Sequence, residues 1–159
     1  MESVKDINTT KRNILKLIGT IFDPLGLIAP IVLQPKLLFK KLCADKYDWD
    51  SILSKEYLNI WYKFINELNS LKSISVDRFA LCNCKDKQVD LHGFCDSSID
   101  AYCACVYVRV VCQHGVKVNL LTSKCRLAPS KSHTIPRLEL MSCLLLAKLI
   151  VAVKQAVEF

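Results

Sequence analysis

Glycine and proline are scarce in this chain of 159 residues, with four and five copies respectively. Their scarcity excludes a collagen-like or linker-rich chain. Charge is scarce as well, because only 23% of the residues are charged while 52% are hydrophobic. A disordered chain is therefore excluded, and the length suits one ordinary domain, or a small module plus part of another.

Targeting signals and long hydrophobic runs are also lacking. The N-terminal stretch MESVKDINTTKRN is polar, whereas a secretory signal peptide needs an apolar core. The most apolar stretch, residues 138–153, contains Glu139 and Lys148 and is shorter than a membrane span. We therefore expect an intracellular, cytoplasmic protein without a membrane partner.

Cysteine, in contrast, is plentiful. The nine cysteines are odd in number and lie scattered within apolar runs rather than in a regular framework. This distribution predicts reduced, buried thiols. The net charge of +7 favours polyanionic partners, although only weakly.

The first half of the chain has the apolar periodicity of helices. Residues 10–22 and 54–70 each place their large apolar side chains on one helical face. Residues 27–43 are expected to form another helix between them, with Pro30 in its first turn. Pro35 is expected to kink or split that helix.

From about residue 74 the pattern changes to short runs rich in β-branched and aromatic residues, typical of strands. The expected strands cover residues 73–82, 89–96, 101–111 and 116–127. The sequence Gln113-His114-Gly115 suits a tight hairpin turn between the last two.

A final helix is expected to open at Pro136 and run to the C-terminus. It is apolar on nearly every side, so we expect it to be buried against the sheet. The chain is therefore predicted to be an α+β protein with a helical segment at 1–73 and a β-rich module at 74–159. One helix leaves the other face of the sheet uncovered, so this module looks like the first part of a larger domain.

Two carboxylates stand at the ends of expected elements. Asp96 ends the strand at 89–96, and Glu139 lies in the first turn of the final helix. A strand end and a helix start can converge when the helix crosses the sheet, and two neighbouring carboxylates repel unless a cation lies between them. Mg²⁺ suits such an all-oxygen site. The alternative is ordinary turn chemistry at Asp96-Ser97 and a helix-dipole interaction at Glu139.

Acidic residues are absent between positions 101 and 138, whereas basic residues are frequent there. The basic residues considered as a nucleic-acid-binding strip are Arg109, Lys117, Lys124, Arg126, Lys131 and Arg137. Such a stretch suits contact with a phosphate backbone. The alternative is a solvated sheet face.

Four segments of the chain resemble the polyprotein of Pao-type (BEL/Pao) LTR retrotransposons. They are TKRNILKLIGTIFDPLGLIAP, DWD at 48–50, LHGFCDSSIDAYCACVYVR and LLTSKCRLAPSKSHTIPRLEL. In that family this region follows the reverse transcriptase palm, and it comprises a thumb-like or connecting helical segment and the start of an RNase H-like domain. The resemblance covers about residues 10–153, and FDPLGL-AP and IPRLEL are its most specific motifs.

The resemblance implies cleavage of RNA in RNA–DNA hybrids by the parent polyprotein, whose palm and nucleic-acid substrate would be the partners. It implies that Asp96 and Glu139 are catalytic ligands of Mg²⁺. The family's next Asp lies in a stretch that this chain does not contain, and the motif does not support Asp100 as a substitute. The 74–159 module is thus expected to be a truncated RNase H-like domain that is inactive alone. Cys103 departs from the family pattern, which commonly has Gly there.

A rival interpretation is a domesticated or degenerate module that binds nucleic acid or serves as a scaffold without chemistry. A third interpretation follows from the peptidase heading under which the family is also catalogued. The sequence offers little for a peptidase, because Asp96-Ser97-Ser98 lacks the Gly of an aspartic peptidase turn.

Overall fold

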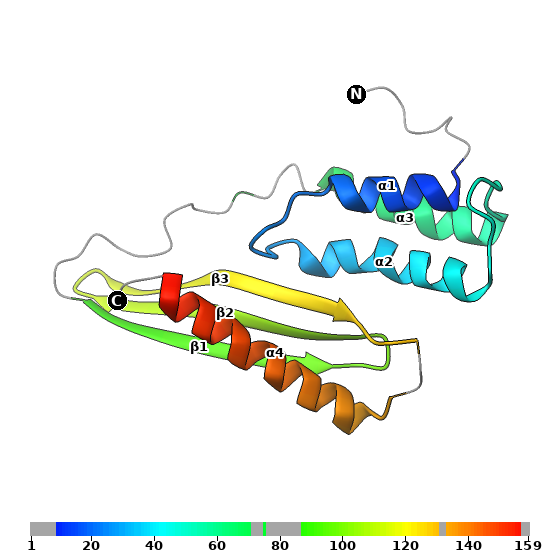
Figure 1. Ribbon diagram of the computed structural model, residues 1–159. Helices are drawn as coiled ribbons and strands as arrows, with labels where there is room; N and C mark the ends of the chain where they lie inside the picture. Colours follow the sequence, from blue (N-terminus) through cyan, green and yellow to red (C-terminus); the bar gives the residue numbers. More distant parts are fainter. Residues whose placement is uncertain (1–8, 71–74, 76–86, 131–132, 157–159) are drawn as a thin grey trace. The chain divides into compact units, whose positions relative to one another are not determined.

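The computed structural model describes residues 9–70, 75, 87–130 and 133–156, which divide between two compact units (Figure 1). Described residues up to Phe22 and from Pro30 to Ser70 belong to the first unit. The second unit holds residues 23–29 together with the sheet and the last helix. The chain is an α+β protein, as its sequence predicts. The expected strand at 73–82 lies almost entirely outside the described residues.

Three helices make up the first unit. They are α1 (Lys11–Thr20), α2 (Ala29–Ala44) and α3 (Lys55–Ser70). Their apolar faces meet in one core, which contains Ile14, Leu38, Leu42, Trp61 and Phe64 among others. Of the two outcomes expected at Pro35, a kink or a split, the split does not occur, because α2 continues through this residue. Pro35 is fully buried, so packing of its ring offsets the backbone hydrogen bond that it cannot donate.

The side chains of the DWD motif contact the first two residues of α1, Lys11 and Arg12. Asp50 accepts two hydrogen bonds from the Arg12 guanidinium, at 2.7 and 2.9 Å. The Lys11 ammonium lies 4.6 Å from the centre of the Trp49 ring and donates to the Tyr47 carbonyl at 3.2 Å. These contacts account for a nearly buried lysine without any ligand.

Three antiparallel strands form the sheet of the second unit, in the order β1-β2-β3. They are β1 (Lys87–Ser97), β2 (Ala101–Cys112) and β3 (Gly115–Leu127). The expected hairpin is present, with Cys112 opposite Gly115 and a positive φ of 116° at Gly115. Even-numbered residues of β2 from Tyr102 to Val110 are buried, and the odd-numbered ones are only partly so.

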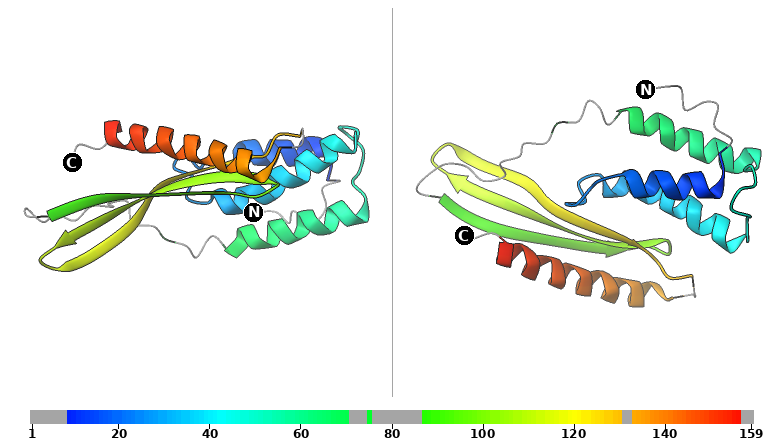
Figure 2. Two further views of the ribbon diagram at one scale, coloured as in Figure 1. Left: turned by 90° about the horizontal axis from the view of Figure 1, so that it is seen from below. Right: turned by 45° about the horizontal axis from the view of Figure 1, so that its top comes forward.

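The last helix, α4 (Ile135–Ala156), lies along one face of this sheet (Figure 2). Its buried side chains recur at helical spacing: Leu138, Ser142, Leu145, Leu149 and Val153. They pack on Tyr102, Ala104 and Val106 of the central strand. No described helix is long and apolar enough to cross a membrane.

A short segment between α1 and α2 joins the sheet, and we call residues 23–29 the clasp. The Leu25 carbonyl accepts hydrogen bonds from the Ser123 amide at 2.7 Å and the Thr122 hydroxyl at 2.9 Å. The Ser123 hydroxyl donates to the Gly26 carbonyl. Asp23 shapes the clasp from within, since its carboxylate accepts from the amide of Leu27 at 2.8 Å. The FDPLGL motif therefore binds the outer strand β3.

Candidate metal and nucleic-acid site

The crossing of β1 and α4 brings the two candidate carboxylates to one end of the sheet. Cys95 and Cys143 meet there with their sulfurs 3.7 Å apart. Further along, side-chain atoms of Leu146 and Ile150 lie 2.8 Å from where a Cβ on Gly93 would stand. Lower residue numbers in β1 therefore meet higher residue numbers in α4, so the helix runs antiparallel to the strand (Figure 1).

Glu139 precedes Cys143 by four residues, which is about one helical turn of 5.4 Å. It therefore lies on the β1 flank of α4, level with the last residues of β1. The electrostatics agree, since the charge of Glu139 acts on the Cys143 thiol. Contact with Cys95 is the main reason that the pKa of this thiol is raised, and Glu139 adds to it.

Asp96 lies at the same end of β1, but its side chain is on the opposite face of the strand from Cys95. It pairs with Cys103 and is exposed, as are Phe94 and His92, whereas Cys95 packs toward α4. One carboxylate oxygen accepts the Ser97 amide hydrogen at 2.7 Å. The backbone thus brings Asp96 and Glu139 to one end of the sheet, but strand alternation points the Asp96 side chain to the face opposite the one that carries α4 and Glu139.

The β1–β2 turn is organised by Ser98 rather than Asp96. The Ser98 hydroxyl accepts from the amides of Asp100 and Ala101, both at 3.2 Å, and the Ser98 amide donates to the Ala101 carbonyl at 2.8 Å. These bonds satisfy the turn without the Asp96 carboxylate. Turn chemistry therefore explains little of why an acidic residue stands at position 96.

The helix-dipole interpretation of Glu139 also weakens. α4 begins at Ile135, so its first turn holds no acidic residue and Glu139 is the fifth residue of the helix. The expectation that Glu139 lies in the first turn is wrong, because Ile135 and not Pro136 opens the helix. The dipole interaction is strongest within the first turn, so it contributes little here.

Neither candidate carboxylate forms an ion pair with a described residue. Three other acidic groups do so: Asp50 pairs with Arg12, Glu56 with Lys41 and Asp90 with Arg109. Asp96 and Glu139 are both exposed, so water can complete the coordination of a cation that they hold. Next to Asp96, the buried Ser97 hydroxyl has no hydrogen-bond partner among the described residues. Oxygen donors with room for water fit Mg²⁺.

The number of ligands is nevertheless small. Within the described parts of the chain, no three His, Cys, Asp or Glu side chains gather at one point. A two-metal phosphodiester site draws on three or four carboxylates, and here the structure offers two.

The basic strip divides between the two faces of the sheet. Lys117, Lys124 and Arg126 pair with Val110, Ala104 and Tyr102, which are buried on the face that carries α4. Directly paired residues share a face, so these three cations stand beside α4.

Arg109 belongs to the opposite face. Its guanidinium donates to the Asp90 carboxylate at 2.9 Å, and the two residues are paired across β1 and β2. Hydrogen bonds from Gln88 and then from Arg109 hold the pKa of Asp90 below its usual value. Arg109 is thus engaged in an ion pair, and Lys131 lies outside the described residues.

Arg137 extends the cations of β3 onto the helix. It precedes the buried Leu138 and Glu139 follows it, so a step of 100° per residue places Arg137 and Glu139 on opposite flanks of α4. The Glu139 flank faces β1, and the Arg137 flank therefore faces β3. Lys148, three turns later, shares that flank and is exposed.

We call these five cations the basic face: Lys117, Lys124, Arg126, Arg137 and Lys148. The sequence-based strip missed Lys148 because it follows Glu139, outside the acid-free stretch. Its spacing of 11 residues from Arg137 is the signal that could have found it.

Two cysteines near Asp96 are oxidised, whereas the sequence predicted reduced thiols. Cys103 of β2 and Cys125 of β3 are directly opposed and form a disulfide. The prediction of reduced, buried thiols is wrong for this pair, because neither residue lies in the core under α4. Among the described residues, five other cysteines are free: Cys43, Cys95, Cys105, Cys112 and Cys143.

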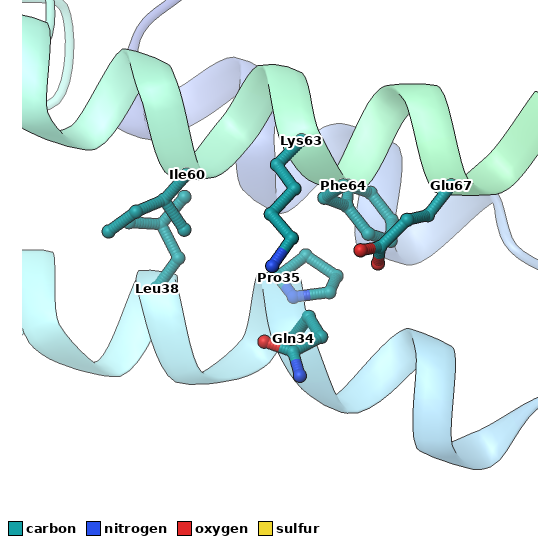
Figure 3. A pocket seen from close by; sticks show the side chains of 7 residues that line it. All are labelled: Gln34, Pro35, Leu38, Ile60, Lys63, Phe64 and Glu67. Atoms are coloured by element: carbon teal, nitrogen blue, oxygen red, sulfur yellow. The ribbon is translucent and has the colours of Figure 1, made fainter.

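A pocket of the first unit lies between α2 and α3 (Figure 3). Pro35, Leu38, Ile60 and Phe64 supply apolar walls, and Lys63 is its basic group. Gln34 and Glu67 complete the lining. Among the described side chains, this lining holds no pair of like groups that would suit metal or acid–base chemistry.

Comparison with known protein families identifies a match over most of the chain. The family model described as Pao retrotransposon-like RNaseH-like domain matches residues 10–159. No curated protein and no solved structure matches the chain.

Proposed function

Because the chain belongs to the Pao retrotransposon-like RNase H-like domain family, we propose that Asp96 and Glu139 contribute to a divalent-metal site acting on RNA–DNA hybrids. The crossing of β1 and α4, which brings these two residues to one end of the sheet, is the observation that carries the proposal. The parent protein would be a retrotransposon polyprotein in which this region works beside a reverse transcriptase palm.

The two carboxylates would hold Mg²⁺ through oxygen atoms, leaving positions for water and a phosphate oxygen. Bound there, the metal would lower the pKa of water and stabilise charge on a phosphodiester. The cations of the basic face would hold the phosphate backbone of the hybrid. The strand β3, which supplies three of the five cations of the basic face, contains no acidic residue. The basic face therefore suits contacts with phosphates that do not recognise bases.

The isolated chain should bind an RNA–DNA hybrid more tightly with Mg²⁺ or Mn²⁺ and should leave it uncleaved, since two carboxylates are too few for two metals. Asp96→Asn and Glu139→Gln should each abolish the metal dependence of binding. Gel mobility of a labelled hybrid, with and without metal, measures both effects. Direct Mn²⁺ titration of the free chain gives a second readout.

Asp100→Asn is the matched control, because Asp100 is an exposed carboxylate of the same turn. It should behave as the unmodified chain does. Cleavage that disappears in Asp96→Asn would show that further ligands exist. Metal dependence that survives in both Asp96→Asn and Glu139→Gln would remove these residues from the site.

Replacing Lys124 and Arg126 by Ala should weaken binding to hybrid and duplex alike. Each lost phosphate contact lowers the slope of log K against log salt by about one, so the double variant should lose roughly two. Filter binding across a salt series measures the slope. Arg109→Ala is the control with a smaller expected effect, because Arg109 already pairs with Asp90 on the opposite face. An unchanged slope in the double variant would make the basic face an ordinary solvated surface.

A second candidate function is nucleic-acid binding or scaffolding without chemistry. It is favoured by the separation of the basic face, on the β3 flank of α4, from the carboxylates on the β1 flank. Salt-dependent binding with no response to metal would support this function over the first.

A further inference from the structure

We propose that Cys95 and Cys143 form an oxidation site, in which a hydroperoxide or a small disulfide such as oxidised glutathione converts the two thiols into a disulfide that links β1 to α4. The proposed hybrid chemistry does not involve these two thiols.

Their geometry suits this reaction. The sulfurs lie 3.7 Å apart although 48 residues separate them in the chain. Rotation of the two side chains must shorten this distance to about 2.05 Å for a disulfide. Among the described free cysteines, Cys43, Cys105 and Cys112 have no such sulfur–sulfur contact.

Their accessibility sets an order of events. Cys143 is exposed on the helix, whereas Cys95 is half-buried beneath it. An oxidant in solution therefore reaches Cys143 first, and Cys95 is the resolving thiol.

The reaction balances with one hydroperoxide. The Cys143 sulfur attacks the peroxide O–O bond and becomes a sulfenic acid while one water or alcohol leaves. The Cys95 sulfur then attacks the Cys143 sulfur, the S–O bond breaks, and water leaves with the remaining proton. Two thiols have lost two electrons, and the peroxide has gained them. With oxidised glutathione, the same two attacks release two molecules of reduced glutathione.

The new bond would join the elements that present the candidate carboxylates. Cys95 is adjacent to Asp96, and Cys143 is one turn from Glu139. Oxidation would therefore fix the start of α4 on the end of β1. It would also close a loop of the unfolded chain, which raises the midpoint of thermal unfolding.

The test treats the full chain with oxidised glutathione and maps cysteines by tandem mass spectrometry under non-reducing conditions. We expect a peptide pair linked through Cys95 and Cys143, with a higher unfolding midpoint. In Cys95→Ser, the mixed disulfide with glutathione should accumulate on Cys143, because no resolving thiol remains. Cys43→Ser is the matched control, and it should still form the linked pair.

Persistent glutathione on Cys143 in the unmodified chain would overturn the proposal, since it would show that Cys95 cannot reach it. Equal modification of Cys43 and Cys143 without any linked pair would also overturn it. Both readouts come from covalent mapping, so they do not depend on whether the chain binds a hybrid or a metal.

Discussion

Replacing Gly26 by Ala should detach the clasp from β3 and destabilise the second unit. Gly26 has a φ of +73°, and an added Cβ would stand 2.0 Å from the Ser123 carbonyl oxygen. A left-handed conformation costs a residue with a Cβ about 1–2 kcal/mol. Loss of the hydrogen bonds to Leu25 and Gly26 adds roughly 0.5–1.5 kcal/mol each. With three such hydrogen bonds, we expect a total loss of about 2.5–6.5 kcal/mol in denaturant unfolding, with faster hydrogen exchange at the Ser123 amide.

Gly19→Ala is the matched control within the same motif-bearing region. Gly19 lies in α1, and an added Cβ would meet nothing within 4 Å. Alanine should stabilise that helix by about 0.5–1 kcal/mol and leave exchange at Ser123 unchanged. If Gly26→Ala were as harmless as Gly19→Ala, the clasp would not be bound to β3 in solution.

Truncating Leu138 should have the second large effect. Its side chain is 1% exposed and fills the core between α4 and β2. Leu138→Ala should cost about 2–5 kcal/mol, because it removes buried methyl groups and leaves a cavity. Leu140, two residues along the same helix, is 69% exposed. Leu140→Ala should change the unfolding free energy by less than about 0.5 kcal/mol.

These two leucines flank Glu139, so the pair also tests how the helix is oriented. Unfolding curves of both variants in urea give the comparison. Equal effects would mean that α4 does not present Leu138 to the sheet, and the placement of Glu139 on the β1 flank would then fail with it.

Local patterns in the sequence were enough to predict most elements. The apolar period identified α1 and α3, and alternation with turn residues identified β1, β2 and β3. The apolar character of α4 on nearly every side predicted that it packs on the sheet, and it does so through Leu145 and its neighbours. A split at Pro35 did not occur, because burial of its ring within α2 is a tertiary effect that no local rule contains.

The candidate site was harder to predict, because its geometry depends on which face of a strand or helix carries each side chain and not only on the residue's place in the sequence. Asp96 and Glu139 were found from the ends of their elements, yet strand alternation and helix register decide the directions of their side chains. Strand alternation places Arg109 on the face opposite Lys124. The helical period places Lys148 on the same flank of α4 as Arg137. The contact between Cys95 and Cys143 had no local signal, since it arises where two distant elements cross.

The clasp also has a consequence for the rate of folding. The contacts of Leu25 with Thr122 and of Gly26 with Ser123 each join residues 97 positions apart. Contacts of such long range slow folding, because the chain must close a large loop before it gains their energy. The β2–β3 hairpin can form locally, so its outer strand should wait for the clasp to arrive. During that interval β3 presents unpaired backbone groups, and pairing with another chain becomes the main competing reaction.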